Sequence, residues 1–239
     1  LRYDSIHGVL QEDILVENNF LVIGNQKIKY TQWQHPEDIS WENVEVVIES
    51  TGKFKTMESA NFHLKNGVKK VIISAPASDD KIPTVVLGVN EKKITNEHHI
   101  ISNASCTTNN AAPMLQLLQD NCKIESAYIT TVHSYTTDQS LHDQPHADLR
   151  RARGAAQSIV PTTTGAAKAL TKIFPELDQK IGGSGIRVPV PNGSLTDITC
   201  YVKHPKSPEE INQLFAEAAK NQLNGILAYT NDPIVSVDV

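Results

Sequence analysis

Short β-rich apolar segments, separated by helix or turn signals, constrain the fold most strongly. Segments 44–48 and 68–74 are dominated by valine and isoleucine, as is typical of strands that are buried on both faces. The stretch 56–65 between them has the pattern of one short helix. Segments 84–89 and 99–102 predict two further strands. This strand–helix–strand order favours an open parallel sheet of the doubly wound type.

An antiparallel element precedes this sheet. Residues 14–30 read ILVE, FLVI and QKIKY, separated by the turn pairs Asn18-Asn19 and Gly24-Asn25, which predicts a small meander. No G-x-G-x-x-G pattern occurs in the 239 residues. The chain begins at Leu1 without methionine and stops at Val239 inside an apolar run. We therefore expect both ends to be cuts through a larger protein whose first βαβ unit lies upstream.

A second region with a different rhythm begins at Cys106. Helix signals cover 107–121, and strand signals follow at 127–133, 185–190 and 198–202. Ser207-Pro208-Glu209-Glu210 is a capping box with proline at the first helical position. The predicted class is therefore α/β, with an incomplete doubly wound (Rossmann-like) domain over 1–105 followed by an α+β catalytic domain over 106–239.

Charge and composition exclude several classes of protein. The net charge is −5 and the pI about 6.0, and no basic run suits nucleic acid or an anionic membrane surface. No apolar stretch has the roughly 20 residues needed to span a bilayer, and no secretory signal is visible. The cysteines number three, an odd and sparse set that suits a reducing cytoplasm. No metal site is predicted.

Cys106 occupies a place where a thiol becomes reactive. It lies in Ser102–Asn109 (SNASCTTN), at a predicted strand-to-helix junction. The positive end of the helix dipole favours thiolate over thiol there. The alternative is an inert core cysteine, which describes most cysteines and fits Cys122 and Cys200.

His133 ends the predicted strand that contains Tyr128–Val132. An imidazole at that strand end can reach a thiol at a helix start and has the pKa range needed for acid–base work. Arg150, Arg151, Arg153 and Arg187 supply guanidinium groups suited to phosphate. The hydroxyl-rich turn Thr162–Gly165 precedes a predicted helix and suits an oxyanion. Taken singly, the arginines could instead form surface ion pairs, and the hydroxyl-rich turn could simply cap a helix.

Taken in order, the motifs resemble glyceraldehyde-3-phosphate dehydrogenases of the phosphorylating kind. The matching segments are SNASCTTN (102–109), TTVH (130–133), TTTGAAKA (162–169) and RVP (187–189), preceded by Tyr3-Asp4-Ser5 with His7-Gly8 and by Glu49–Gly52 (ESTG). The pattern HSYTTDQ…RRAR…TTTGAAKA is more similar to the bacterial enzymes than to the animal ones.

The resemblance implies oxidation of glyceraldehyde 3-phosphate to 1,3-bisphosphoglycerate with NAD, through a thiohemiacetal and a thioester on the cysteine. Cys106 would be the nucleophile and His133 the general base. The groups that hold inorganic phosphate would be Ser105, Thr107, Thr164 and Gly165. Those that hold the substrate's own phosphate would be Thr136, Arg151 and Arg187, with Arg187 serving both.

Cofactor and partner expectations also follow from the resemblance. Thr51, Gly52 and Ser74 resemble cofactor contacts, and Gln144-Pro145 resembles members that use NAD and not NADP. The stretch 135–157 resembles a loop that packs between subunits, which implies a homotetramer. Three positions depart from the family pattern: Asn110 replaces a second cysteine, Gln34 replaces an arginine near the adenine, and Gly193 replaces a valine.

Two alternatives stay open at this point. Erythrose-4-phosphate dehydrogenases use the same cysteine and histidine, although they differ from this chain at 164–169. A non-catalytic fragment that keeps the fold is the other alternative. Because the glycine-rich fingerprint lies outside these residues, we expect the 239 residues alone to show little or no dehydrogenase turnover.

Overall fold

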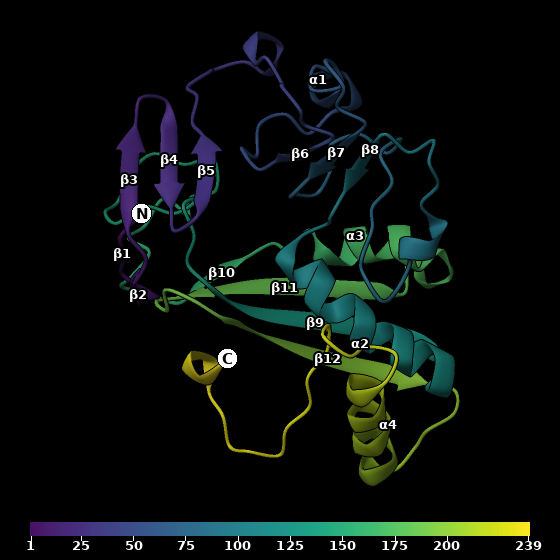
Figure 1. Cartoon of the computed structure of the whole chain (residues 1–239). Coiled ribbons are helices and arrows are strands. Elements are labelled where there is room, and N and C mark those ends of the chain that lie inside the picture. The colour runs from purple at the N-terminus through teal and green to yellow at the C-terminus, as the bar shows by residue number, and fades with distance from the viewer. The chain divides into compact units, whose positions relative to one another are not determined.

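The computed structural model describes residues 1–239, which divide into two compact units, 1–40 and 41–239 (Figure 1). In the first unit, β1 (Tyr3–Asp4) pairs with β2 (Gly8–Val9). The meander consists of β3 (Ile14–Glu17), β4 (Phe20–Ile23) and β5 (Gln26–Lys29), all antiparallel. The short helix η1 (Pro36–Asp38) follows. The predicted meander is confirmed.

The second unit opens with a parallel sheet in the order β6-β7-β8. Its strands are β6 (Val46–Glu49), β7 (Lys70–Ile73) and β8 (Ile100–Ser102). Helix α1 (Met57–Asn61) connects β6 to β7 and begins at a capping box formed by Thr56 and Ser59. The open parallel sheet that the apolar segments predicted is therefore present.

The strand predicted at 84–89 is wrong. Only Thr84 makes an isolated bridge, to Ser102. The Asn90 side chain accepts from the Val86 amide at 2.7 Å and donates to the Thr84 carbonyl at 2.9 Å. These bonds and the left-handed Gly88 (φ 78°) curl the segment into a turn ahead of η2 (Glu91–Lys93). Val85 and Val86 are buried in this turn and not in a sheet, whereas Leu87 is exposed.

The catalytic region is a mixed four-stranded sheet in the order β10-β11-β9-β12. Its strands are β9 (Ile124–Ser134), β10 (Val160–Thr162), β11 (Ile181–Val188) and β12 (Ser194–Val202), and only β9 and β11 are parallel. The longer helices are α2 (Cys106–Cys122), α3 (Ala166–Ile173) and α4 (Pro208–Lys220), and two short helices are η3 (Pro175–Leu177) and η4 (Ser236–Asp238).

Helices α2 and α3 cover one face of this sheet (Figure 1). Leu115 of α2, Ile129 of β9 and Leu170 of α3 are fully buried in the core between them. Helix α4 begins at the predicted capping box and packs on α2 through Leu117 and Ala218. This packing fixes the starts of α2 and α3 relative to the ends of β9 and β11. None of the helices is both long and apolar enough to cross a membrane.

Candidate active site

Cys106 is the first residue of α2. Its neighbour Ser105 caps the helix, because the Ser105 hydroxyl accepts from the Thr108 amide at 3.1 Å. The strand-to-helix turn contains Ala104 in the left-handed region (φ 59°), and Cys106 itself is exposed. The unpaired amides of the first turn and the helix dipole both favour a negative sulfur at this position.

His133 lies beside this sulfur. Its Nε2 is 3.2 Å from Cys106 Sγ. Its Nδ1 lies 2.7 Å from Nη1 of Arg187 and 2.8 Å from the Ser134 carbonyl oxygen. The Arg187 guanidinium can only donate and the Ser134 carbonyl can only accept, so Nδ1 has a donor and an acceptor beside it. Nε2 is the ring nitrogen that faces the sulfur.

The surroundings of His133 keep its imidazole neutral. Burial lowers the pKa of His133, and the positive charge of Arg187 lowers it further, although the Ser134 carbonyl acts in the opposite direction. Burial also lowers the pKa of Arg187, against the raising effect of the Cys106 charge. A neutral imidazole next to a thiolate can accept a proton during reaction.

Arg151 is held in place by two groups. Its Nε and Nη2 donate to Thr162 Oγ1 at 2.9 and 2.7 Å, and its Nη1 forms an ion pair with Asp138. Although burial raises the pKa of Asp138, bonding to Arg151 outweighs it and holds that pKa below the usual range. The guanidinium is therefore fixed at the wall of the site.

The predicted anion-binding residues meet in one cavity of about 210 Å³. Cys106 and His133 line it, together with Ser105, Thr107, Arg151, Thr164, Gly165 and Arg187. Thr136 does not line it; this residue lies just after β9, where its carbonyl accepts from the Gln139 amide. The motifs thus converge from α2, β9, β11, the loop before β10 and the turn before α3.

Thr131 and Thr162 line the same cavity. The sequence indicated Thr162 only as part of the hydroxyl-rich turn, and it gave Thr131 no role of its own. Thr131 lies two residues before His133, so both side chains point to the same face of β9. That period-of-two spacing was the available signal. Thr162 is the first residue of the hydroxyl-rich turn, and its role as the acceptor for Arg151 depends on a tertiary contact.

The three predicted cofactor residues lie elsewhere, at the carboxyl edge of the parallel sheet. Thr51 and Gly52 follow β6, and Ser74 follows β7. The Ser74 amide donates to the Glu49 carbonyl at 3.0 Å, which places the two strand ends side by side. Gly52 is left-handed (φ 74°), and a Cβ there would meet no atom within 4 Å. This edge is open to a ligand.

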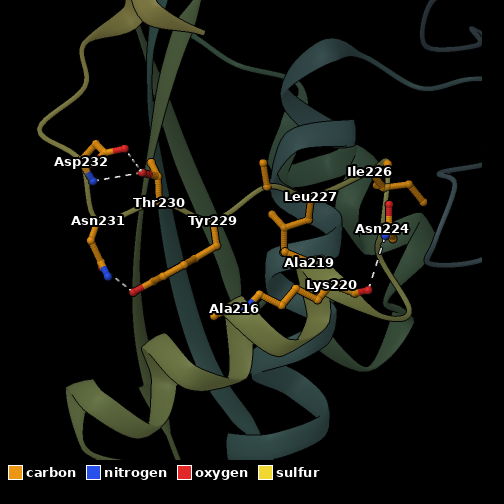
Figure 2. A pocket seen from close by; sticks show the side chains of 12 residues that line it. Ala216, Ala219, Lys220, Asn224, Ile226, Leu227, Tyr229, Thr230, Asn231 and Asp232 are labelled. Atoms are coloured by element: carbon orange, nitrogen blue, oxygen red, sulfur yellow. Dashed lines mark hydrogen bonds between the residues drawn. The ribbon is translucent and has the colours of Figure 1, made fainter.

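A larger hollow, of about 990 Å³, lies between α4 and residues 224–232 (Figure 2). Its polar side chains bond to one another: Tyr229 donates to Asn231 at 2.8 Å, and Thr230 donates to Asp232 at 3.0 Å. The hollow holds neither a cysteine nor a histidine. The smaller cavity at Cys106 is therefore the better candidate for chemistry.

Fold and site together define a cysteine–histidine centre in a cavity that arginine side chains and hydroxyl groups also line. Residues 105–239 match the family described as glyceraldehyde 3-phosphate dehydrogenase, C-terminal domain, and residues 1–57 match its NAD binding domain. The glyceraldehyde-3-phosphate dehydrogenase of Geobacillus stearothermophilus is 48% identical over 241 residues, which cover 100% of this chain and 72% of that protein.

Two further relatives carry the same name. Glyceraldehyde-3-phosphate dehydrogenase 1 of Bacillus subtilis is 48% identical, covering 100% of this chain and 72% of the relative. The enzyme of Mycobacterium avium is 50% identical over 243 residues, covering 100% and 71%. The chain belongs to the glyceraldehyde-3-phosphate dehydrogenase family, and the resemblance seen in the motifs is confirmed.

Proposed function

We propose that this protein oxidises glyceraldehyde 3-phosphate in the presence of inorganic phosphate and NAD, and forms 1,3-bisphosphoglycerate. The observation that supports this proposal most directly is the 3.2 Å contact between Cys106 Sγ and His133 Nε2. The cavity around this contact is also lined by Arg151 and Arg187. A thiolate splits aldehyde oxidation into acylation and phosphorolysis, two easier steps.

The open carboxyl edge of the parallel sheet fits a dinucleotide. Ligands of such sheets bind outside the carboxyl ends of the strands, where Thr51, Gly52 and Ser74 are exposed. The left-handed Gly52, with free space around it, lets a ligand approach the backbone closely. These three residues would contact NAD. NAD, when bound, supplies the acceptor for the hydride that the oxidation releases.

Cys106 and His133 carry the covalent steps. The sulfur adds to the aldehyde carbon and forms a thiohemiacetal. The proton of the Cys106 thiol passes by way of His133 Nε2 to the new oxygen. The neutral imidazole then accepts the hydroxyl proton at Nε2, while the hydride would leave to bound NAD and the carbon becomes a thioester. An oxygen of inorganic phosphate then attacks the acyl carbon, the carbon–sulfur bond breaks, and the Cys106 thiolate is restored.

Phosphate recognition falls to the arginines and the helix starts. Arg151 and Arg187 would hold the substrate's phosphate, with Thr136 as a further contact. Ser105, Thr107, Thr164 and Gly165, at the starts of α2 and α3, would hold inorganic phosphate. Amides at helix starts and bidentate guanidinium groups both suit phosphate oxygens.

We further propose an oligomeric state, a cellular location and a domain boundary for this protein. We expect a homotetramer in which the loop 135–157 packs between subunits. A cytoplasmic location is consistent with three cysteines that are all free. The proposed domain division lies between residues 105 and 106, directly before the nucleophile.

The test follows NADH formation by the purified full-length protein. We expect turnover with glyceraldehyde 3-phosphate and inorganic phosphate, loss of turnover in Cys106→Ser, and retention in Cys122→Ser. A higher kcat/KM for erythrose 4-phosphate would favour the erythrose-4-phosphate dehydrogenase alternative. If Cys106 alkylated no faster than Cys122, activation of the thiol would be refuted and the non-catalytic alternative favoured.

A further inference from the structure

A buried carboxylate–imidazole pair lies away from the catalytic cysteine. Glu49 ends β6 and His63 follows α1, and each is only 3% exposed. Glu49 Oε2 lies 3.1 Å from His63 Nε2. The steps assigned to Cys106 and His133 do not use this pair.

The second carboxylate oxygen of Glu49 faces the turn that follows β6. Oε1 accepts from the Thr51 amide at 2.7 Å and also from the Thr51 hydroxyl. The same hydroxyl accepts from the Lys53 amide at 3.2 Å. One buried carboxylate therefore fixes the backbone and the side chain of Thr51, and through that hydroxyl it fixes the far side of Gly52.

Stability of the fold does not by itself require a carboxylate here. The surrounding cluster is apolar and includes Val47, Val71 and Ile73. Burying an ionised group costs several kcal/mol, and well-packed apolar replacements of buried ion pairs are often neutral or stabilising. An apolar side chain at position 49 could fill this space, but it could not accept from Thr51.

We propose that Glu49 is a positioning residue for the NAD site, holding the Thr51–Gly52 turn in the conformation that receives the cofactor. This inference rests on the proposed function, which places NAD at that turn. His63 orients the carboxylate, because its one hydrogen bond is to Oε2 of Glu49 and leaves Oε1 directed at Thr51. The His63 ring lies 5.7 Å from the ring of Trp41, centroid to centroid.

This arrangement accounts for the residue types around the turn. Thr51 supplies the hydroxyl that links Glu49 to Lys53, and Gly52 supplies the left-handed backbone (φ 74°) that lets the chain reverse between them. The turn is exposed while its anchor is buried. A rigid anchor under an exposed turn keeps the ordering cost of binding low.

The experiment compares Glu49→Leu, Glu49→Gln and Thr51→Val in the full-length protein. We expect NAD to bind about tenfold more weakly to Glu49→Leu and Thr51→Val, the size of effect given by losing one charge-assisted hydrogen bond. Glu49→Gln should lose less, because its amide oxygen can still accept from Thr51. In the absence of NAD, amide hydrogen exchange at Thr51 and Lys53 should be faster in Glu49→Leu. Glu45→Gln, which removes an exposed carboxylate paired with Lys69, should bind like the wild type.

Two control readouts separate positioning from general damage. The urea midpoint of Thr51→Val, which changes an exposed side chain, should match that of the wild type, and the alkylation rate of Cys106 should not change. Thr51→Val alters an exposed side chain, so it tests the clamp even if Glu49→Leu fails to fold. Unchanged NAD affinity in folded Glu49→Leu, or in Thr51→Val where Glu49→Leu does not fold, would overturn this inference but not the proposed function. Failure of the wild type to bind NAD would overturn it together with the proposed function.

Discussion

Replacing His133 by asparagine tests the central pair directly. Asparagine places its amide nitrogen near the position of Nδ1, so no donor remains at the site of Nε2, 3.2 Å from Cys106 Sγ. A hydrogen bond to a charged group contributes about 1.5–3 kcal/mol. Because Cys106 is exposed, water replaces part of the lost donor, and the lower end of that range applies.

That lower end corresponds to about a tenfold effect. We therefore expect His133→Asn to react with iodoacetamide at Cys106 about tenfold more slowly than the wild type at neutral pH. Mass spectrometry of the labelled peptide resolves Cys106 from Cys122 and Cys200. His204→Asn, which changes an exposed histidine on the segment after β12, should react like the wild type.

One result would refute the reasoning. If folded His133→Asn is alkylated as fast as the wild type, His133 does not stabilise the thiolate. The first turn of α2 would then be sufficient for that purpose. The histidine would keep only its proposed role as a base, which kcat reports separately.

Three further perturbations test other parts of the structure. Arg187→Gln removes a positive charge that lowers the pKa of His133, so that pKa should rise. His133 is protonated at pH values below the acid limb of the kcat/KM profile, and this limb should therefore move to higher pH. An unmoved limb would contradict the assigned cause. Leu170→Ala empties a fully buried core position and should lower the free energy of unfolding, measured in urea, by about 2–5 kcal/mol. Leu195→Ala changes an exposed side chain and should leave this free energy nearly unchanged. Gly88→Ala should lower the melting temperature, because φ is 78° and the new Cβ would lie 2.7 Å from the Leu223 side chain; an unchanged melting temperature would show that the turn relaxes.

Local signals predicted the elements that depend on local chemistry. The meander turns at Asn18-Asn19 and Gly24-Asn25, the capping box at Ser207 and the start of α2 at Cys106 all depend on residues within a few positions of one another. The apolar run 84–89 had the composition of a strand, but side-chain bonds from Asn90 turned it. Composition alone does not reveal which backbone groups such a side chain will engage.

The motifs of the candidate site could be predicted from the sequence, but the contacts between their side chains could not. His133 and Arg187 are separated by 54 residues and meet because β9 and β11 pair in parallel with these two residues in register. The bond from Arg151 to Thr162 likewise spans 11 residues of irregular chain. Register between distant strands depends on the whole sheet, so the contact between Arg187 and His133 could not be read from the sequence.

The same register explains why the cavity has groups that suit anions. Parallel pairing brings the carboxyl ends of β9 and β11 to one edge, and the first residues of α2 and α3 line the cavity that forms there. Both helix dipoles therefore present their positive ends to the cavity. Arg151 and Arg187 add full positive charges, and no aspartate or glutamate lines the cavity. Asp138, outside the lining, offsets part of the Arg151 charge, but Arg187 and the two helix starts still favour anions. This environment suits the phosphorylated aldehyde and the second phosphate that the proposed phosphorolysis requires.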